Sequence, residues 1–440
     1  MDSSDWVRAA KATRAQAATA GFSPADHGVA LTLIDATDEG GYLRGELAEF
    51  ADRLGCGLER IEAVLAVCHG FEPTGVMARS VPECLKLQLI ERNRFDPAMA
   101  ALLDNLDLLA RRDLGALSDD QYDGDDPELI DCIIRHLLPR RGIRARPDQV
   151  LLTMSGTQAI DLICRFLLRP GDTVLVDDPC YFNFRALLRA HQVKLVSVPY
   201  TPSGPDVASF EAVLEAERPR LYITVSGLHN PTGATMSPQT AHRVLNAATA
   251  CDLTIVEDDI FADFEPEPSA RLAALDGLNR VIRIGSFSKT LSASLRCGFI
   301  AARADWIEQL VDLQVATGFG GPCAVATEII ASVLATGFYR KHVEELRRRL
   351  ARARRDVGEK LQRIGIEPWL MPRGGFQLWC RLPDGCDSAD VARAALADNI
   401  VLAPGNVFST TQSASGFMRF NVAQCRDPKL MPALQRALGR

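Results

Sequence analysis

The fold prediction starts from VIRIGSFSKT, residues 281–290, and extends outward from it. The first half of this stretch is β-branched and apolar, which is typical of a buried strand. The second half places Ser286 three residues and Ser288 one residue before Lys289. Hydroxyls at this spacing can hold a phosphate while the lysine amine forms an imine with a carbonyl-bearing cofactor. Taken alone, the same pattern also fits a surface turn.

Short apolar runs alternate with helical stretches from residue 150 onward. This rhythm predicts βαβ units, and the continuously apolar runs predict a parallel or mixed sheet covered by helices on both faces. The runs are VLLTM at 150–154, TVLVDD at 173–178, VKLVSV at 193–198, LYITV at 221–225, LTIVEDD at 253–259, VIRIGSFS at 281–288 and CGFIAA at 297–302. Long helices return from about residue 322, and IGIEPWLMP, GFQLWCRL and GFMRFNVA then predict a small α+β domain.

Three of these runs precede polar segments that suit ligand binding. Ser155-Gly156-Thr157-Gln158 opens a helix whose unpaired N–H groups and dipole can receive a phosphate, although a simple helix cap would look the same. Asn230-Pro231-Thr232-Gly233 carries an amide that can donate to an oxygen anion, although a β-turn would look the same. Glu257-Asp258-Asp259 ends a strand at the carboxyl edge, where open α/β sheets bind ligands. Buried carboxylates at that edge need a cationic partner.

These segments, together with DPCY at 178–181, SFSKT followed by Arg296, and RFNVA at 419–423, resemble the fold-type-I pyridoxal-phosphate enzymes of the class I and II aminotransferase family. The nearest resemblance is to the aminotransferase-like domain of MocR-type bacterial regulators, and it covers about residues 121–440. It implies an α/β fold of the PLP-dependent transferase type. That fold has a mixed, mostly parallel sheet with helices on both faces and a small C-terminal α+β domain.

The resemblance implies roles for three catalytic residues. Lys289 would bind pyridoxal 5′-phosphate (PLP) through an imine and then carry a proton between the substrate's α-carbon and the cofactor. Asp258 would pair with the pyridinium nitrogen, and Tyr181 would stack on the ring. A desolvated, cationic surrounding would keep the lysine amine partly neutral, as both of its tasks require.

The remaining implied contacts are to the cofactor, the substrate and a second subunit. Asn230 would bond the phenolic oxygen of the ring, and Arg419 would grip the α-carboxylate of an amino acid or 2-oxo acid in a bidentate fork. Tyr122 matches a tyrosine that reaches the neighbouring subunit's phosphate, which implies a homodimer. The phosphate itself would be held by Gly156, Thr157, Ser286, Ser288 and Arg296. No metal site is expected.

The chain departs from the family pattern at three places. Phe261 stands where the family usually has a tyrosine, so a phenol that donates to the cofactor oxygen is missing. The stretch after Tyr122 is shorter than usual and reads Ile-Asp where Leu-Arg is usual. No counterpart of the family's N-terminal arm, which crosses the mouth of the active site, is found. Phe261 favours weaker tuning of the cofactor rather than loss of binding, and the changed stretch implies different dimer packing near the site. The missing arm counts most against turnover.

Residues 5–117 have a different pattern of apolar residues, and this pattern predicts helices only. Apolar positions recur at helical spacing from Leu43 to Leu54, with Gly55 ending that helix, and Ser80-Val81-Pro82-Glu83 has the form of a capping box. The acidic, turn-rich segment 118–127 marks a boundary. We therefore predict a helical module at 1–117, a large PLP-binding domain at 118–321, and long helices with a small C-terminal domain at 322–440.

The helical module resembles the core-binding region of sigma-54 transcription factors. The matching sequence segments are LIDATDEGGYL at 33–43, FEPTGVMARSVPECLKLQL at 71–89 and DPAMAALLDNLDLLARRDL at 96–114. Residues 1–120 hold 12 basic and 20 acidic side chains, which accounts for the excess acid in a chain of net charge −7. An acidic surface suits a basic protein partner, here core RNA polymerase, and direct DNA binding is not expected. The module could equally serve only for packing, or be a relic.

Composition limits where the protein works and what else it binds. Twelve scattered cysteines without a Cys-x-x-Cys pair predict reduced thiols. The chain shows neither a signal-type start nor a long apolar run, so we expect a cytoplasmic protein without a membrane span. The arginine-rich stretch 347–355 has helical apolar spacing and acidic neighbours, which favour a solvated helix face over a nucleic-acid patch.

Two functions follow from the sequence. The first is a PLP-dependent aminotransferase acting on an α-amino acid and a 2-oxo acid, although related PLP chemistry would use the same cofactor residues. The alternative is a PLP-binding regulatory protein that docks on RNA polymerase through residues 5–117 and has little or no turnover.

Overall fold

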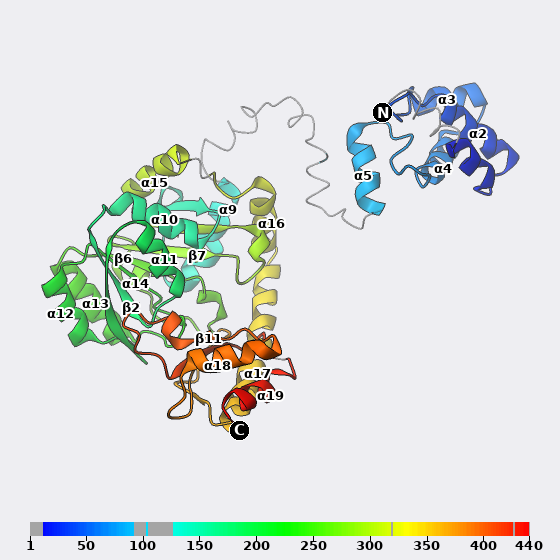
Figure 1. Cartoon of the computed structure of the whole chain (residues 1–440). Coiled ribbons are helices and arrows are strands. Elements are labelled where there is room, and N and C mark those ends of the chain that lie inside the picture. The colour runs from blue at the N-terminus through cyan, green and yellow to red at the C-terminus, as the bar shows by residue number, and fades with distance from the viewer. Residues whose placement is uncertain (1–11, 92–102, 104–125, 318–319, 426, 440) are drawn as a thin grey trace. The chain divides into compact units, whose positions relative to one another are not determined.

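The computed structural model describes residues 12–91, 103, 126–317, 320–425 and 427–439. The chain divides into two compact units, Met1–Asp120 (unit 1) and Gln121–Arg440 (unit 2), shown in Figure 1. The three-domain division at 117/118 and 321/322 stays a prediction. Within the described ranges, no helix is both long and apolar enough to cross a membrane.

Unit 1 is built from short helices around one small core. Leu33, Phe50, Ile61 and Met77 are buried together at its centre. The helices are α2 (Pro24–Asp35), α3 (Leu47–Leu54), α4 (Leu58–Cys68) and α5 (Val81–Glu91). The prediction of a helical region before the α/β fold is confirmed.

The helix expected from Leu43 begins four residues later than predicted. Leu43 forms an isolated bridge with Thr37, and its N–H donates to the Ala78 carbonyl, so its backbone is extended rather than helical. The helix does end at Gly55, which adopts a left-handed conformation with φ 63°. The pattern of apolar residues was correct, but it could not reveal a bridge that takes the first of them out of the helix.

The capping box at the start of α5 is only half formed. The Glu83 N–H donates to Ser80 Oγ over 3.3 Å, as the motif predicts. The Glu83 carboxylate, however, accepts from the backbone N–H of Arg79 at 2.6 Å, one residue before the expected Ser80. The Arg79 guanidinium pairs with the same carboxylate, so the ion pair draws the glutamate to that residue.

Unit 2 contains an eight-stranded sheet in the order β1-β8-β7-β6-β5-β2-β3-β4. All seven predicted apolar runs form strands of this sheet. The strands are β1 (Val150–Thr153), β2 (Thr173–Asp178), β3 (Lys194–Thr201), β4 (Gly204–Pro205), β5 (Leu221–Thr224), β6 (Thr254–Asp258), β7 (Val281–Ser286) and β8 (Gly298–Ala301). The five strands from β7 to β3 are parallel, and β8 lies antiparallel between β7 and β1. The predicted mixed, mostly parallel sheet is confirmed.

Helices cover both faces of this sheet, so that neighbouring residues of a strand pack into two different cores. In β5, Leu221 and Ile223 join one core and Tyr222 joins the other. The helices on the first face are α10 (Gly156–Leu167), α11 (Phe182–Ala190) and α15 (Ala304–Ala316). Those on the second face are α9 (Pro127–Cys132), α12 (Val207–Glu217), α13 (Pro238–Ala250), α14 (Leu272–Asp276) and α16 (Ala324–Ala335).

A four-stranded antiparallel sheet forms the small C-terminal part of unit 2, in the order β11-β12-β10-β9. Its strands are β9 (Glu367–Pro368), β10 (Gln377–Arg381), β11 (Ala403–Pro404) and β12 (Phe417–Asn421), and its helices are α18 (Ser388–Ala395) and α19 (Leu430–Ala437). In Figure 1 the orange and red elements α18, β11 and α19 lie together at one end of the unit. The predicted α+β character of this part is confirmed.

The long helix α17 (Phe338–Arg363) carries the arginine-rich stretch, and not all of its arginines are solvated. Arg354 is buried and donates to the carbonyls of Gly375 and Arg373. Half-buried Arg347 donates to the Asp263 carbonyl at 2.6 Å. The prediction of a wholly solvated face was therefore wrong for these two residues, which hold loops against the helix.

Candidate active site

The predicted residues of the large sheet gather at one edge. Strands β1, β2, β5, β6 and β7 all run in the same direction, since β1 and β7 are both antiparallel to β8. Their carboxyl ends lead into Ser155–Thr157, Tyr181, Asn230, Asp258 and Ser286–Lys289 respectively. This edge is where open α/β sheets bind ligands.

One part of the edge offers donors for a phosphate. Gly156 and Thr157 are the first residues of α10, so their N–H groups have no acceptor within the helix. The N-cap Ser155 Oγ accepts from the Gln158 N–H at 3.1 Å. Ser286 ends β7, and its Oγ accepts from the Ser288 N–H at 3.2 Å and donates to the Cys297 carbonyl at 3.3 Å.

Glycines bring these donor segments together. A Cβ on Gly298 would lie 2.9 Å from the Gly285 carbonyl oxygen and 3.2 Å from the Ser155 carbonyl carbon. Only a glycine therefore lets β8, β7 and the start of α10 meet. Arg296 lies two residues before Gly298, is exposed, and has a left-handed backbone with φ 46°. The arrangement gathers N–H and hydroxyl groups at one point, and Arg296 adds a guanidinium close in sequence; all three are groups that bind phosphate oxygens.

Three adjacent buried carboxylates at the end of β6 are compensated in different ways. Glu257 accepts from the N–H groups of Leu272 and Ala273 at the start of α14, both at 2.9 Å. Asp259 is ion-paired with Arg271 at 2.8 Å and with Arg283 at 3.1 Å. Burial raises the pKa of Glu257, whereas the two arginines hold the pKa of Asp259 below its ordinary value despite its burial.

Asp258 has no such partner. Its side chain is buried, and its one described hydrogen bond is from the Ile260 N–H at 3.3 Å. Among the described residues no lysine or arginine lies within 4.0 Å of its carboxylate. Burial raises the pKa of Asp258 to about 7, against an ordinary value of 3.8, while the Lys289 charge acts to lower it. A cationic group placed against Asp258 would remove this penalty, which is what a protonated ring nitrogen would do.

Lys289 lies in the turn after β7, and its side chain is exposed. It is close enough for its charge to act on Asp258. The following residue, Thr290, is buried against Tyr339, whose hydroxyl lies 3.0 Å from Thr290 Oγ1. The lysine therefore extends from a firmly packed turn into open space at the sheet edge.

Three further predicted residues, Tyr181, Asn230 and Arg419, lie near one another. Arg419 donates from Nη1 to Asn230 Oδ1 at 3.0 Å, which leaves the amide N–H₂ of Asn230 free to donate. The charges of Arg419 and Asp258 both act on the Tyr181 phenol, whose pKa burial raises. Tyr181 therefore lies close to both, as expected of a ring that covers a ligand between them.

Arg419 is a half-buried cation without a carboxylate partner in the described part of the chain. Its guanidinium lies over the Phe408 ring, 4.7 Å from the centroid. Burial lowers the pKa of this guanidinium. An anion such as a carboxylate would compensate this charge with two parallel hydrogen bonds.

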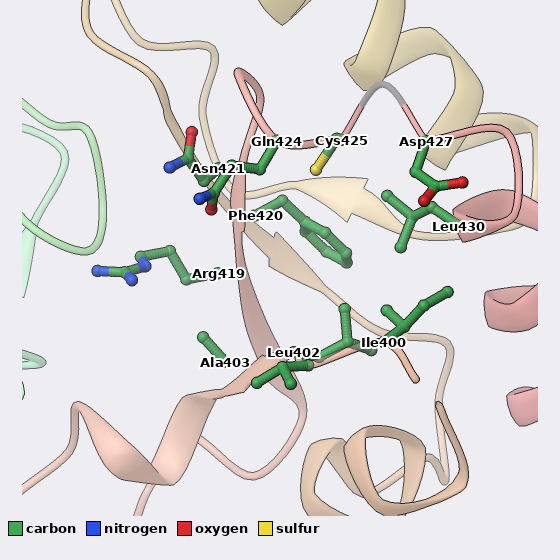
Figure 2. Close-up of a pocket in the computed structure, with 11 residues that line it drawn as sticks. Ile400, Leu402, Ala403, Arg419, Phe420, Asn421, Gln424, Cys425, Asp427 and Leu430 are labelled. Carbon is green, nitrogen blue, oxygen red and sulfur yellow. The ribbon is translucent and has the colours of Figure 1, made fainter. Parts of the chain in front are cut away.

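A hollow of about 350 Å³ lies beside β11 and β12, between residues 400–403 and 419–430. Of the predicted site residues, only Arg419 lines it. Figure 2 shows the Arg419 side chain pointing away from Phe420 and Leu430, which line the apolar part of the hollow. The hollow is therefore distinct from the sheet edge, where the other described site residues lie.

One sequence departure, Phe261, and one predicted site residue, Tyr122, have different outcomes. Phe261 is buried and packs edge-on against Phe376, with ring centroids 5.6 Å apart, so its position is filled by an apolar contact without a phenol. Tyr122 lies outside the described residues, as does most of the segment expected to form the domain boundary.

Sequence reasoning missed Asp178 and Phe408. Asp178 accepts from Thr410 and Thr411, more than 230 residues away along the chain. Phe408 is fully buried beneath Arg419. DPCY was singled out for its tyrosine, and nothing local to Asp178 signals a partner so distant in sequence.

Comparison with known proteins relates each unit to a different family. The family model described as "Aminotransferase class I and II" matches residues 101–436, and the model described as "Sigma-54 factor, core binding domain" matches residues 10–152. The second match extends beyond the expected 5–117 into the start of unit 2. The two resemblances found in the sequence are confirmed.

Individual proteins divide in the same way. The HTH-type transcriptional regulator TauR of Rhodobacter capsulatus is 34% identical over 309 residues, 69% of this chain and 62% of TauR. The RNA polymerase sigma-54 factor of Caulobacter vibrioides is 54% identical over 132 residues, 29% of this chain and 26% of that factor. This chain thus spans less than two thirds of either relative.

A solved structure shows the same fold as unit 2. The kynurenine aminotransferase of Pyrococcus horikoshii, crystallised in complex with PMP, superposes with a TM-score of 0.66 at 25% identity. The match covers 75% of this chain and 86% of that protein. The predicted PLP-dependent transferase fold is confirmed.

Proposed function

Because the chain belongs to the class I and II aminotransferase family, we propose that it transfers the amino group of an α-amino acid to a 2-oxo acid with pyridoxal 5′-phosphate as its cofactor. One observation carries the proposal. Asp258 is the only one of three adjacent buried carboxylates left without a cation or helix N-terminus, and Lys289 is close to it. A buried carboxylate without a counter-charge is stabilised when a cationic ligand binds beside it.

The residues at the sheet edge fit this cofactor. Gly156, Thr157, Ser286, Ser288 and Arg296 would hold its phosphate, and Asp258 its ring nitrogen. Tyr181 would cover the ring, and the free amide N–H₂ of Asn230 would donate to its phenolic oxygen. When bound, PLP supplies an aldehyde that captures amines and a protonated ring that withdraws electrons from the α-carbon.

The chain's own residues would then bind and move protons. Arg419 fixes the α-carboxylate of the substrate in a bidentate fork, and the fork orients the α-carbon. Lys289 would accept the proton from that carbon and deliver it to the cofactor. Its amine must therefore be unprotonated at the start. Asp258 stays ionised against the ring nitrogen and keeps that nitrogen protonated. Phe261 contributes no proton donor, so Asn230 alone would hold the phenolic oxygen.

The site also favours a homodimer. Tyr122 matches a residue that reaches a neighbouring subunit's phosphate, so two chains would complete each other's sites. A cytoplasmic location would give such an enzyme access to amino acids and 2-oxo acids. Side-chain preference is open, because Arg419 selects only for an α-carboxylate.

A screen of amino donors tests the proposal. Purified full-length protein loaded with PLP is mixed with single amino acids while the absorption spectrum is recorded. We expect at least one amino acid to convert the visible band of the aldehyde form into the near-ultraviolet band of the amine form, and a 2-oxo acid to restore it. A protein that binds PLP but is converted by no donor would contradict transamination.

A second candidate function, docking on core RNA polymerase with little turnover, is favoured by the sigma-54 match at 54% identity and the acidic charge of unit 1. Exposed Glu59 and Glu62 on α4 allow a direct test. Full-length protein would retain core polymerase at low salt, and reversing both charges to lysine would weaken retention. The matched control reverses Glu308 and Asp312 on α15 of unit 2, and it should leave retention unchanged. Equal retention by all three proteins would count against docking through unit 1.

A further inference from the structure

Asp178 forms a cluster with a loop of the small C-terminal part of unit 2, and we call Asp178, Thr410 and Thr411 the clasp. Asp178 Oδ2 accepts from Thr410 Oγ1 at 2.8 Å, from Thr411 Oγ1 at 2.7 Å and from the Thr411 N–H at 3.0 Å. Asp178 ends β2 in the large sheet, three residues before Tyr181. The clasp therefore ties the sheet edge to a loop that approaches it from a different sheet.

The Asp178 carboxylate is half-buried, and this loop supplies its hydrogen bonds. Its second oxygen, Oδ1, is buried and has no hydrogen-bond partner in the structure. All donors that stabilise the carboxylate within the described residues thus come from Thr410 and Thr411 through Oδ2. Loss of these donors would leave a half-buried carboxylate with one buried, unpartnered oxygen, so the loop and the sheet edge are coupled through this side chain.

Two further contacts fix the same loop beside Tyr181. The Cys180 N–H donates to the Phe408 carbonyl at 2.9 Å. Arg185 Nη1 donates to the Ser409 carbonyl at 2.9 Å. Residues on both sides of Tyr181 therefore hold the backbone that carries Phe408.

Phe408 passes this constraint to Arg419. Its ring is fully buried, packs edge-on against Trp379 with centroids 5.8 Å apart, and lies 4.7 Å beneath the Arg419 guanidinium. On another side, Arg419 donates to Asn230 at 3.0 Å. The guanidinium is thus fixed by one direct bond and by one ring whose position depends on the loop.

From this geometry we propose that Asp178 is a positioning residue, which holds Phe408 and thereby sets the orientation of Arg419 toward the substrate α-carboxylate. The proposal rests on the proposed function, because Arg419 matters only if a carboxylate binds there. Asp178 is not among the residues proposed to hold substrate or cofactor. Its removal should weaken carboxylate recognition and leave the reactivity of the cofactor aldehyde unchanged.

A pair of probes separates these effects. Aminooxyacetate and O-methylhydroxylamine would both displace the Lys289 amine from its imine with bound PLP and form an oxime, but only aminooxyacetate has a carboxylate for Arg419. For Asp178→Asn we expect the rate constant with aminooxyacetate to fall roughly tenfold and that with O-methylhydroxylamine to stay within about twofold. Arg419→Ala gives the reference loss. Asp206→Asn, at the N-cap of α12, is the matched control and should change neither rate.

A general loosening of the fold would slow both probes equally, and an idle Asp178 would slow neither; both results would overturn the proposal. Should Asp178→Asn fail to fold, Thr411→Val removes one donor and keeps the carboxylate, and the same selective loss, smaller in size, is expected. Calorimetric titration of cofactor-free protein with succinate provides a separate readout. Weaker succinate binding by Asp178→Asn than by wild type supports the proposal even if PLP fails to bind, whereas equal affinity contradicts it.

Discussion

Unit 2 buries several charged side chains, whereas the described part of unit 1 keeps its charged side chains at the surface. In unit 2, Asp177, Glu257, Asp258, Arg271 and Arg283 are all buried. In the described part of unit 1, the buried polar side chains are Thr13 and Thr37, and the charged side chains lie at the surface. Burying a charge costs several kcal/mol unless a partner compensates it.

This difference indicates where each unit does its work. In unit 2, Asp258 and Arg419 have no partner of opposite charge among the described residues. Such charges prepare a site for a small charged ligand. Unit 1 keeps its acidic groups in water, where they act over a wide area and suit a large basic partner.

The largest expected effect is at Lys289. Lys289→Ala should lower transamination by at least about 10³-fold, because the residue that binds the cofactor and moves the proton is lost. Steady-state assays with the best amino donor check this. Lys194→Ala removes an exposed lysine paired with Glu217 and serves as the control, with activity expected to stay unchanged. Substantial residual activity of Lys289→Ala would remove the lysine from the proposed mechanism.

The next largest effect compares an ion pair in each unit. Arg271 is fully buried between Asp259 and Glu265, at 2.8 and 2.7 Å. Arg271→Met should lower the free energy of unfolding by about 3–5 kcal/mol, because a buried carboxylate loses its counter-charge. In unit 1, Arg60→Met breaks an exposed pair with Asp26 and should change stability little. Urea denaturation of both variants measures the contrast, and equal losses would contradict it.

A pH effect of intermediate size is expected from Asp258 in cofactor-free protein. Its folded pKa of about 7 lies above the ordinary 3.8, so the folded state keeps a proton that the unfolded chain releases. The stability that this proton confers is complete below about pH 4 and is lost as the pH rises through 7, by up to about 1.4 kcal/mol per pH unit. The unfolding free energy of wild type minus that of Asp258→Asn should show this slope. A flat difference would mean that Asp258 is already compensated.

The smallest effect is expected on α5 of unit 1. Val81 and Ile90 are each 52% exposed, and the helix has no buried residue. Ile90→Ser should therefore change the free energy of unfolding by about 0.5 kcal/mol or less. Thermal denaturation tests this, and a larger loss would show that Ile90 is buried against another part of the chain.

The sequence allowed the sheet and much of its edge to be predicted, because both depend on local patterns. Seven apolar runs became strands, since β-branched residues favour extended backbone wherever two helical layers cover them. The glycines and serines around Gly156 and Ser286 are typical of chain turns at strand ends, and such turns can be predicted from residue type alone. The roles of the site residues remain proposals.

Contacts between distant segments could not be predicted. Leu43 lies outside its predicted helix because its N–H donates to the Ala78 carbonyl, and Arg354 binds carbonyls of a loop about 20 residues away instead of water. Asp178 and Thr410 meet across 232 residues. In each case the local pattern was compatible with another structure, and a tertiary contact decided between them.

The central claim is that Lys289, at the edge of the unit 2 sheet, binds the cofactor covalently. The most direct test loads the full-length protein with PLP, reduces it with borohydride, digests it and locates the modified lysine by mass spectrometry. We predict a phosphopyridoxyl group on Lys289 alone, at about one per chain. A modification on other lysines without Lys289, or no modification at saturating PLP, would contradict the account.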